Sequence, residues 1–462
     1  MPTTIDSREA RMSRFIPVDR QTSYLFPPSV EDWLPENHLA RFIVEVIERL
    51  DLSELTRQFA GRGSAAHHPA VLLGLLIYGY ATGLPSSRKI ERATYDSVAF
   101  RYIAANTHPD HDTLAAFRRR CGEQFEQLFV QVLMLARELG MLKLGKIAID
   151  GSKVKANASR HSALSWGHIK KIETQLRQEV KQLMALAESE DLKQVPDGMD
   201  VPQEIARRQE RLAALDEAKR KLEERARESD AQAQAEYEAK VAKRQAKRDA
   251  GKKPGGNDPE PPSAGGPQDK DQINLTDEES RIMKVGSGFD QCYNAQAAVD
   301  TDSMLIVGGF VTQAGNDSQQ IAPMLEVLAR RQEQLGQIGQ VLADTGYFSA
   351  ANVAACEEAG IVPMIAMKRE QHHPPMLDRF TEPAQLPPDA TAVEAMAHRL
   401  KTKTGRADYA LRKQTVEPVF GIIKHVMKFR QFLVRGKQKV AHEWNLVALA
   451  WNLKRMNAMN MT

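Results

Sequence analysis

The stretch Lys146-Ile147-Ala148-Ile149-Asp150-Gly151-Ser152-Lys153 decides the fold that the sequence predicts. Its apolar residues Ile147 to Ile149 are typical of a buried β-strand, and Asp150 ends that run. Gly151 and Ser152 then indicate a turn or loop that leaves the strand. An acid at the end of a strand is held stiffly beside a loop that leaves room for a substrate. Taken alone, the pattern equally suits an ordinary turn aspartate.

The pattern recurs in Gln340-Val341-Leu342-Ala343-Asp344-Thr345-Gly346-Tyr347-Phe348, again a short apolar run that ends in aspartate and is soon followed by glycine. A third acid, Glu417, lies in a basic, helix-like segment near the C-terminus. Hard divalent cations prefer carboxylate oxygen over histidine or cysteine ligands. Three acids on separate elements, with no histidine beside them, therefore predict a site for a hard metal ion.

Composition narrows the class of protein. The chain has 462 residues, enough for one to three domains. No apolar run approaches the ~20 residues of a membrane span, and no signal-peptide core is evident. The three cysteines match neither a zinc spacing nor a disulfide framework. We therefore expect a cytoplasmic, nucleoid-associated protein with no membrane partner.

The net charge of +3 is unevenly distributed. Residues 401–462 contain 13 Lys or Arg and 3 Asp or Glu, a net charge of +10. Such a basic segment beside candidate metal-binding acids indicates a polyanionic substrate. Without those acids, a solvated helix face would explain the charge as well.

The N-terminal part is expected to be helical. Residues 1–20 are polar and predicted to be flexible, and 21–140 are predicted to form an all-α domain for DNA binding or dimerisation. The segment His108-Pro109-Asp110-His111-Asp112-Thr113 could form a metal cluster, but we favour a helix start capped by Asp112 or Thr113. Basic residues at the helix ends, Arg88, Arg118 and Arg119, are candidates for DNA contact, and solvated helix faces are the alternative.

Residues 161–250 read as an insertion. Apolar residues from Ile169 to Leu222 repeat at helical spacing, with a break at Pro196-Asp197-Gly198. This pattern predicts a helical hairpin, packed within one chain or used as a dimer zipper. Residues 251–280, rich at first in glycine and proline, are predicted to be a flexible linker.

With the insertion set aside, residues 141–160 and 281–462 read as one α/β unit. The predicted order is strand, strand, strand, helix, strand, helix, strand, helix. The first acid ends the first strand, the second ends the fourth, and the third lies on a C-terminal helix. Pro418 is an unusual residue inside that helix, because proline there costs ~3 kcal/mol or a kink.

At this point the chain resembles the bacterial insertion-sequence transposases of the DDE class, in particular the IS-four and IS-five superfamily. The matching stretches are Asp150-Gly151-Ser152, Asp344-Thr345-Gly346-Tyr347, and Tyr409 to Lys424. Tyr409 to Arg412 and Glu417 to Lys424 keep the family spacing, but four residues instead of three separate Arg412 from Glu417. Gln291 to Gln296 resembles the family's second strand, and residues ~15–125 resemble its N-terminal helical domain.

The resemblance implies an α/β ribonuclease H-like catalytic domain, a mixed sheet flanked by helices, with an all-α N-terminal domain and a helical-hairpin insertion. It implies that Asp150, Asp344 and Glu417 are catalytic and bind two Mg²⁺ or Mn²⁺ ions. The implied DNA contacts are Arg412 and Lys424, with Tyr409, Lys153 and Lys155 as weaker candidates.

The expected activity is metal-dependent cleavage and strand transfer of insertion-sequence ends. The partners would be double-stranded DNA, as terminal inverted repeats and target DNA, and further copies of the chain in a homodimer or higher assembly. Two alternatives are a ribonuclease H-like nuclease without strand transfer and a non-catalytic DNA-binding protein on the same fold.

Overall fold

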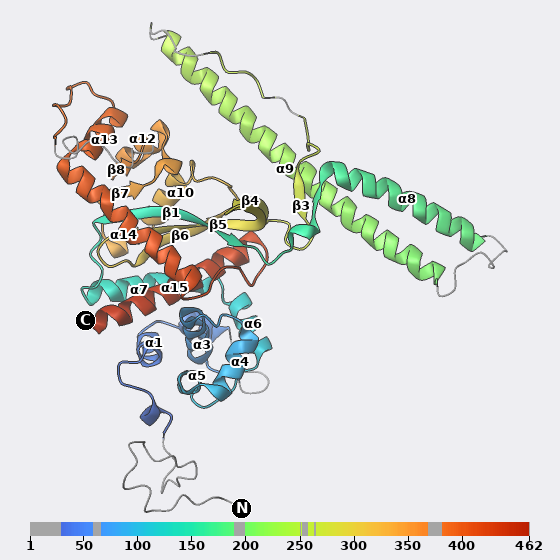
Figure 1. Cartoon of the computed structure of the whole chain (residues 1–462), viewed down its shortest axis with the longest axis horizontal. Helices are drawn as coiled ribbons and strands as arrows, with labels where there is room; N and C mark the ends of the chain where they lie inside the picture. The colour runs from blue at the N-terminus through green and yellow to red at the C-terminus, as the bar shows by residue number, and fades with distance from the viewer. Residues whose placement is uncertain are drawn as a thin grey trace, which may run out of the picture.

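The structure is a computed structural model that describes residues 29–58, 66–188, 199–249, 251, 257–262, 265–367 and 381–461. These residues form a mixed α/β body from which a long two-helix arm projects (Figure 1). The body has a six-stranded mixed sheet with helices packed around it.

The sheet is built around two central strands, β1 and β5. Its order is β4 (Arg281–Val285), β5 (Gly288–Asp300), β1 (Lys146–Lys155), β7 (Gln340–Ala343) and β8 (Val362–Ile365), and β6 (Ile306–Thr312) also pairs with β5. Strand β1 is antiparallel to β5 and parallel to β7, and β7 is parallel to β8. The carboxyl ends of β1 and β7 therefore point the same way.

Strand β1 does not end at its aspartate, so that part of the prediction is wrong. Pairing with β5 continues from Ile147 to Lys155, and Asp150 lies opposite Ala297 in the interior of the strand. Pairing with β7 involves only Lys146 to Ala148. Asp150 thus lies just beyond the point where β1 loses its neighbour on one side, and that edge is open to the residues that follow β7.

The helices of the sheet region follow the predicted alternation. They are α10 (Ile321–Ala329), α11 (Gln332–Leu335), α12 (Ala350–Glu358), α13 (Ala392–Lys401), α14 (Lys403–His425) and α15 (Lys437–Asn460). Three strands, a helix, a strand, a helix, a strand and further helices succeed one another after the arm is set aside, with β4 as an unpredicted addition. Helix α14 includes Pro418 without a break and packs across β1 and β5.

Seven α-helices precede the sheet in the described part of the chain. They are α1 (Leu39–Glu48), α2 (Ser53–Arg57), α3 (Pro69–Thr82), α4 (Ser87–Asp96), α5 (Val98–Ile103), α6 (His111–Arg120) and α7 (Gln124–Glu138). Helix α6 begins earlier than predicted, and its N-cap is Asp110, whose carboxylate accepts a hydrogen bond from Thr113 N at 2.7 Å. The cap satisfies a backbone N–H that would otherwise lack a partner.

Helix α15 joins these N-terminal helices to the sheet. It contacts α3 and α7 on one side and β6 on the other, between the two groups of elements (Figure 1). Trp444 and Asn452 are buried and bond the sheet: the Trp444 indole donates to Gln296 O, and the Asn452 amide bonds both N and O of Ile306. One continuous apolar core therefore runs from α1 to α15.

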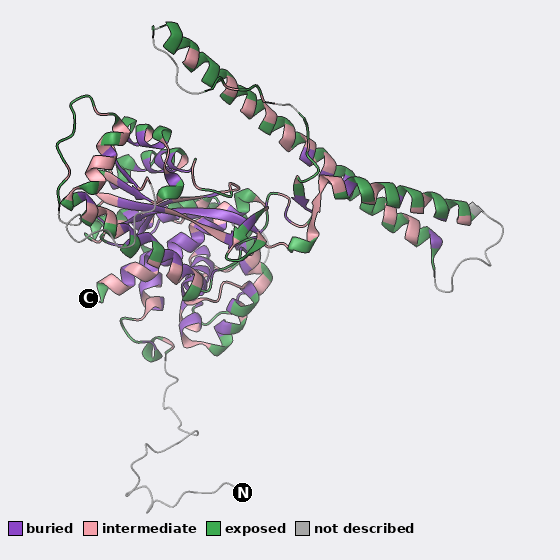
Figure 2. Ribbon diagram, turned by 45° about the horizontal axis from the view of Figure 1, so that its top comes forward, coloured by how far each residue is buried: buried purple, intermediate pink, exposed green. Residues whose placement is uncertain are grey.

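The arm consists of α8 (Trp166–Glu188) and α9 (Val201–Asp249), and it leaves the body at a small sheet of β2 (Ala163–Ser165) and β3 (Gln272–Asn274). Ile169 and Leu176 of α8 are buried against Leu215 and Leu222 of α9. The rest of α9 extends past the small sheet as a single, largely exposed helix (Figures 1 and 2).

The prediction of a flexible linker at residues 251–280 is wrong in part. Strand β3 lies within this range, because its backbone pairs with β2. The predicted break at Pro196-Asp197-Gly198 falls outside the described residues. In the described part of the chain, no single helix is long and apolar enough to span a membrane, and α3 and α4 pass such a test only as a pair bent by 97°.

Candidate active site

The three predicted acids lie on the elements that meet at the open edge of β1. Asp150 is on β1 with 22% of its side chain exposed, and Glu417 is on α14 with 48% exposed. Asp344 follows β7 directly and caps a short 3₁₀ turn, its carboxylate accepting a hydrogen bond from Gly346 N at 2.8 Å. Because β1 and β7 are parallel neighbours, their aspartates emerge on the same side of the sheet.

Arg412 links two of these acids. Its Nη2 donates to Glu417 Oε1 at 2.8 Å, and its Nη1 lies 3.7 Å from Asp150 Oδ2. The extra residue between Arg412 and Glu417 therefore does not separate their side chains. Arg412 is 8% exposed, and its Nε and Nη1 have no hydrogen-bond partner among the residues that the structure describes. A buried guanidinium with unsatisfied donors is costly, so this cluster is poised to accept a further polar group.

The electrostatics around Asp150 favour a cation. The pKa of Asp150 is raised from 3.8 to about 6, chiefly by burial and also by the charges of Asp344 and Asp317, while the Gly151 N–H and Arg412 oppose the rise. The pKa rises because a carboxylate loses hydration when buried and is repelled by neighbouring carboxylates. A divalent cation would relieve both effects.

Asp317 is an acid that the sequence analysis did not select. Its Oδ1 accepts hydrogen bonds from the amides of Asn294 and Gln296, each at 2.7 Å, and its Oδ2 lies 3.6 Å from Lys153 Nζ. The Tyr347 hydroxyl donates to Gln296 Oε1 at 2.5 Å, which ties this network to the turn after Asp344. Two polar residues alternating with alanine in the buried strand β5 were the available signal.

Gly151 leaves room for this network. A Cβ at this position would lie 2.1 Å from Gln296 Nε2 and 2.5 Å from Asp317 Oδ1, closer than atoms can pack. The glycine in the Asp-Gly-Ser stretch is therefore required by close packing within a strand. It is not required by a turn, contrary to the sequence-based interpretation.

Lys424 lies on the same side of β1 as Asp150. Its Nζ donates to Ser152 Oγ and to Lys153 O, and burial lowers its pKa. Tyr409 donates to Ala343 O at 3.3 Å, next to Asp344. Lys155 forms an ion pair with Asp290 at 2.6 Å, so its charge is already balanced within the protein.

Metal binding requires a rearrangement of this cluster. As placed, no three His, Cys, Asp or Glu side chains among the described residues form a group that could hold a metal ion. Arg412 stands between Asp150 and Glu417 and offsets part of their negative charge. The donor set of carboxylate oxygens nevertheless suits Mg²⁺ or Mn²⁺, because the three acids together carry more negative charge than the single Arg412 guanidinium balances.

The candidate DNA contacts of the N-terminal helices differ in exposure. Arg88 of α4 and Arg119 of α6 are exposed. Arg118 is 9% exposed and donates to the Tyr80 hydroxyl at 3.2 Å and to Pro85 O at 3.1 Å. Its guanidinium is thus used inside the protein, and we do not retain Arg118 as a DNA contact.

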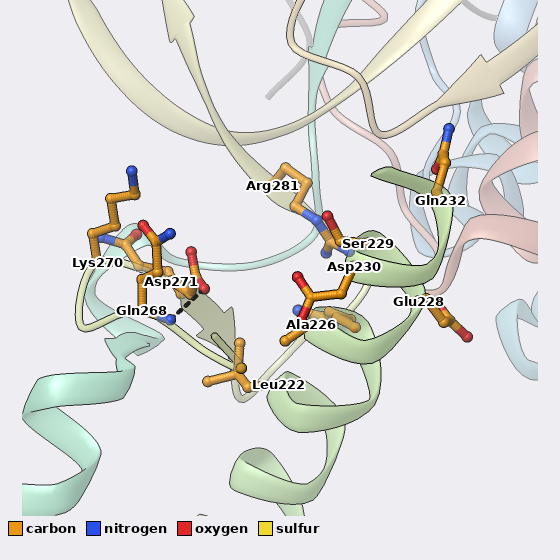
Figure 3. A pocket seen from close by; sticks show the side chains of 13 residues that line it. Leu222, Ala226, Glu228, Ser229, Asp230, Gln232, Gln268, Lys270, Asp271 and Arg281 are labelled. Carbon is orange, nitrogen blue, oxygen red and sulfur yellow. Dashed lines mark hydrogen bonds between the residues drawn. The ribbon is translucent and has the colours of Figure 1, made fainter. Parts of the chain in front are cut away.

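An open hollow of about 610 Å³ lies at the root of the arm, away from these acids (Figure 3). Asp230 and Arg281 line one wall, and Lys270 and Asp271 line the other. The lining bears charges of both signs and includes none of the predicted site residues. The hollow therefore indicates no single class of ligand.

Two comparisons identify the class of protein. A family model described as a transposase domain (DUF772) matches residues 28–120, and one described as a transposase DDE domain matches residues 383–457. The second match includes Arg412, Glu417 and Lys424 but neither Asp150 nor Asp344. No curated protein and no solved structure is significantly similar to the chain.

Together with the mixed α/β body, these matches define a DNA transposase, an enzyme that cleaves DNA and transfers strands. More particularly, the chain is an insertion-sequence transposase of the DDE class.

Proposed function

We propose that Asp150, Asp344 and Glu417 are the catalytic acids of this transposase, within a ribonuclease H-like domain formed by residues 141–160 and 281–462. The observation that carries the proposal is the contact of one guanidinium, that of Arg412, with both Asp150 and Glu417. Asp344 lies close enough to Asp150 to raise its pKa. Side chains that are remote in the sequence thus share one electrostatic environment.

The three carboxylates of Asp150, Asp344 and Glu417 would together hold two Mg²⁺ or Mn²⁺ ions. Two such ions stabilise the attacking and leaving oxygens of an in-line displacement at phosphorus. The role of the chain is to keep these acids close together on rigid elements and to shield Asp150 from water.

The basic residues of the site would bind the DNA backbone. Arg412, which now pairs with the acids, becomes available to a phosphate when cations neutralise those acids. Lys424 is held beside Asp150 by Ser152 and the β1 backbone. Lys153 and Tyr409 would make further contacts, and the exposed Arg88 and Arg119 would bind DNA outside the site.

The substrates we propose are the terminal inverted repeats of the element and its target DNA. Two ends must be held together for transfer, so we also propose that the protein works as a dimer or larger assembly. The N-terminal helices would form a unit for DNA binding or dimerisation. Sedimentation of the protein with and without end DNA measures the assembly.

The test compares Asp150→Asn and Glu417→Gln with the exposed control Glu358→Gln on α12. We expect both site variants to lose cleavage of a plasmid that carries the element ends, while binding of end DNA persists. The control should cleave like the unaltered protein. Cleavage at the unaltered rate in either site variant would contradict the assignment.

A strand-transfer assay distinguishes a transposase from a nuclease that only hydrolyses DNA. A pre-cut end with a free 3′-hydroxyl should be joined to target DNA by the unaltered protein. Hydrolysis without joining would instead identify a nuclease on the same fold, and DNA binding with neither activity would identify a binding protein.

A further inference from the structure

Helix α9 changes the sign of its charge along the part that extends past the small β2–β3 sheet. Residues 223–239 contain two arginines and six acids, whereas residues 240–249 contain five Lys or Arg and one acid. The last ten residues of the helix, which we call the tip, thus have a net charge of +4 at the end of a projecting arm (Figure 1).

The basic residues of the tip lie on one side of the helix. Lys240, Lys243 and Lys247 follow one another at spacings of three and four, and Arg244 and Arg248 lie beside them. Residues with this spacing are neighbours on a helix surface. The acids of residues 223–239 have no such single stripe and surround the helix.

This stripe already binds one oxyanion. The carboxylate of Asp258 lies 3.0 Å from Arg244 Nη2 and 3.0 Å from Arg248 Nη2 through the same oxygen. Asp258 is 71% exposed, and its segment lies along α9 at this point. One oxygen bridging two guanidiniums a helical turn apart is a geometry that a phosphate oxygen can adopt.

The three lysines of the stripe are less engaged with acidic side chains than its two arginines are. Lys240 is 67% exposed and its nearest acid, Glu236, is 3.8 Å away, a distance typical of a weak surface pair. Lys243 and Lys247 are exposed. Three exposed ammonium groups aligned along one face match the sequence-independent way in which proteins contact DNA phosphates.

We propose that the tip of α9 binds the phosphate backbone of duplex DNA at a distance from the catalytic acids. The proposal rests on the transposase function and adds a second DNA contact on the arm. A second copy of the chain is a poorer occupant, because the acids of residues 223–239 do not form a complementary stripe.

The test measures the affinity of a labelled duplex of arbitrary sequence over a range of salt concentrations. The variant has Lys240→Gln, Lys243→Gln and Lys247→Gln, and glutamine keeps the helix propensity. The logarithmic salt slope should become less negative by about three, one unit for each phosphate that a lysine no longer neutralises. Raising salt from 50 to 200 mM should therefore weaken binding about 40-fold less than in the unaltered protein.

The matched control removes three charges from the α8–α9 hairpin instead, with Lys171→Gln, Lys181→Gln and Arg211→Gln. It should keep the salt slope of the unaltered protein. Asp258→Asn should change the slope in the opposite direction, making it steeper, because Arg244 and Arg248 lose their carboxylate. Circular dichroism verifies that each variant keeps its helix content.

The outcomes distinguish this proposal from that of the active site. Asp150→Asn should bind with the unaltered slope yet not cleave. An unchanged slope in the Lys240, Lys243 and Lys247 variant would overturn the proposal even if cleavage requires Asp150. A change in sedimentation without a change in DNA affinity would overturn it as well, in favour of contact between copies.

Discussion

At the scale of single residues, Asp150 is the group whose ionisation should affect stability. In the folded protein its pKa is about 6, and burial is the largest cause. The unfolded chain binds this proton less tightly, with a pKa near 3.8. The contribution of Asp150 to the free energy of unfolding is therefore most favourable below pH ~4. It is lost as pH rises through ~6, where the buried carboxyl must ionise.

Asp150→Asn should therefore stabilise the metal-free protein at neutral pH. The gain in the free energy of unfolding should be about 2 kcal/mol larger at pH 7.5 than at pH 4.5. Urea unfolding in the presence of a chelator at the two pH values measures this difference. A gain that is equal at both values would show that the Asp150 carboxyl is not strained by burial.

The candidate residues of the site could be selected from the sequence, but their surroundings could not. Asp150 and Glu417 stood out because each broke a local pattern, and Arg412 does contact Glu417. Asp317 itself has no local signal, because its importance depends on Asn294 and Gln296 of β5, which lie beside it only in the folded chain.

At the scale of elements, local patterns predicted the helices and the order of strands. The length of β1 depended on a long-range partner. Gly151-Ser152 has the composition of a turn, but β5 supplies backbone partners as far as Lys155 and keeps the segment extended. Strand β3 is similar, since Gln272–Asn274 becomes a strand only because β2 lies beside it. Propensity was overridden by tertiary pairing in both cases.

Helices α3, α6 and α15 meet at a buried polar cluster. Glu443 of α15 is fully buried, accepts hydrogen bonds from the Tyr80 hydroxyl and from Leu433 N, and lies close enough to the Arg118 guanidinium for their charges to interact. Desolvation raises the pKa of Glu443, and the charge of Arg118 opposes that rise. Arg118 thus holds N-terminal and C-terminal elements together.

Arg118→Met should destabilise the protein by about 3–5 kcal/mol, because it leaves a buried acid without its cation. The neighbouring exposed Arg119→Gln is the matched control and should change the free energy of unfolding by less than about 0.5 kcal/mol. Urea unfolding of both variants measures the contrast. Similar stability of the two would mean that Glu443 is protonated and needs no cation.

At the scale of the whole molecule, the arm and the body have separate apolar clusters. The body has one apolar core from α1 to α15, whereas the arm has its own cluster, which includes Ile169, Leu215 and Ile273. The arm is joined to the body where Ser165 of β2 pairs with Gln272 of β3. Because these two residues lie opposite each other in the strand pair, a short turn could connect them directly.

Replacing Trp166 to Asp271 by Asn-Gly should close β2 and β3 into a hairpin, because a two-residue turn of this type matches the twist of paired strands. Ile273→Thr would accompany the deletion, since Ile273 loses its apolar cover. The shortened protein should unfold cooperatively within a few degrees of the unaltered body, because no residue of the main core has been removed. It should retain plasmid cleavage at low salt, and its affinity for DNA should fall less steeply with salt than that of the unaltered protein, because the tip no longer contacts phosphates. Calorimetry and the salt-dependent binding assay measure these properties.

Loss of cooperative unfolding would instead show that the arm is needed to fold the body. The α9 tip would then have to be tested by substitution alone.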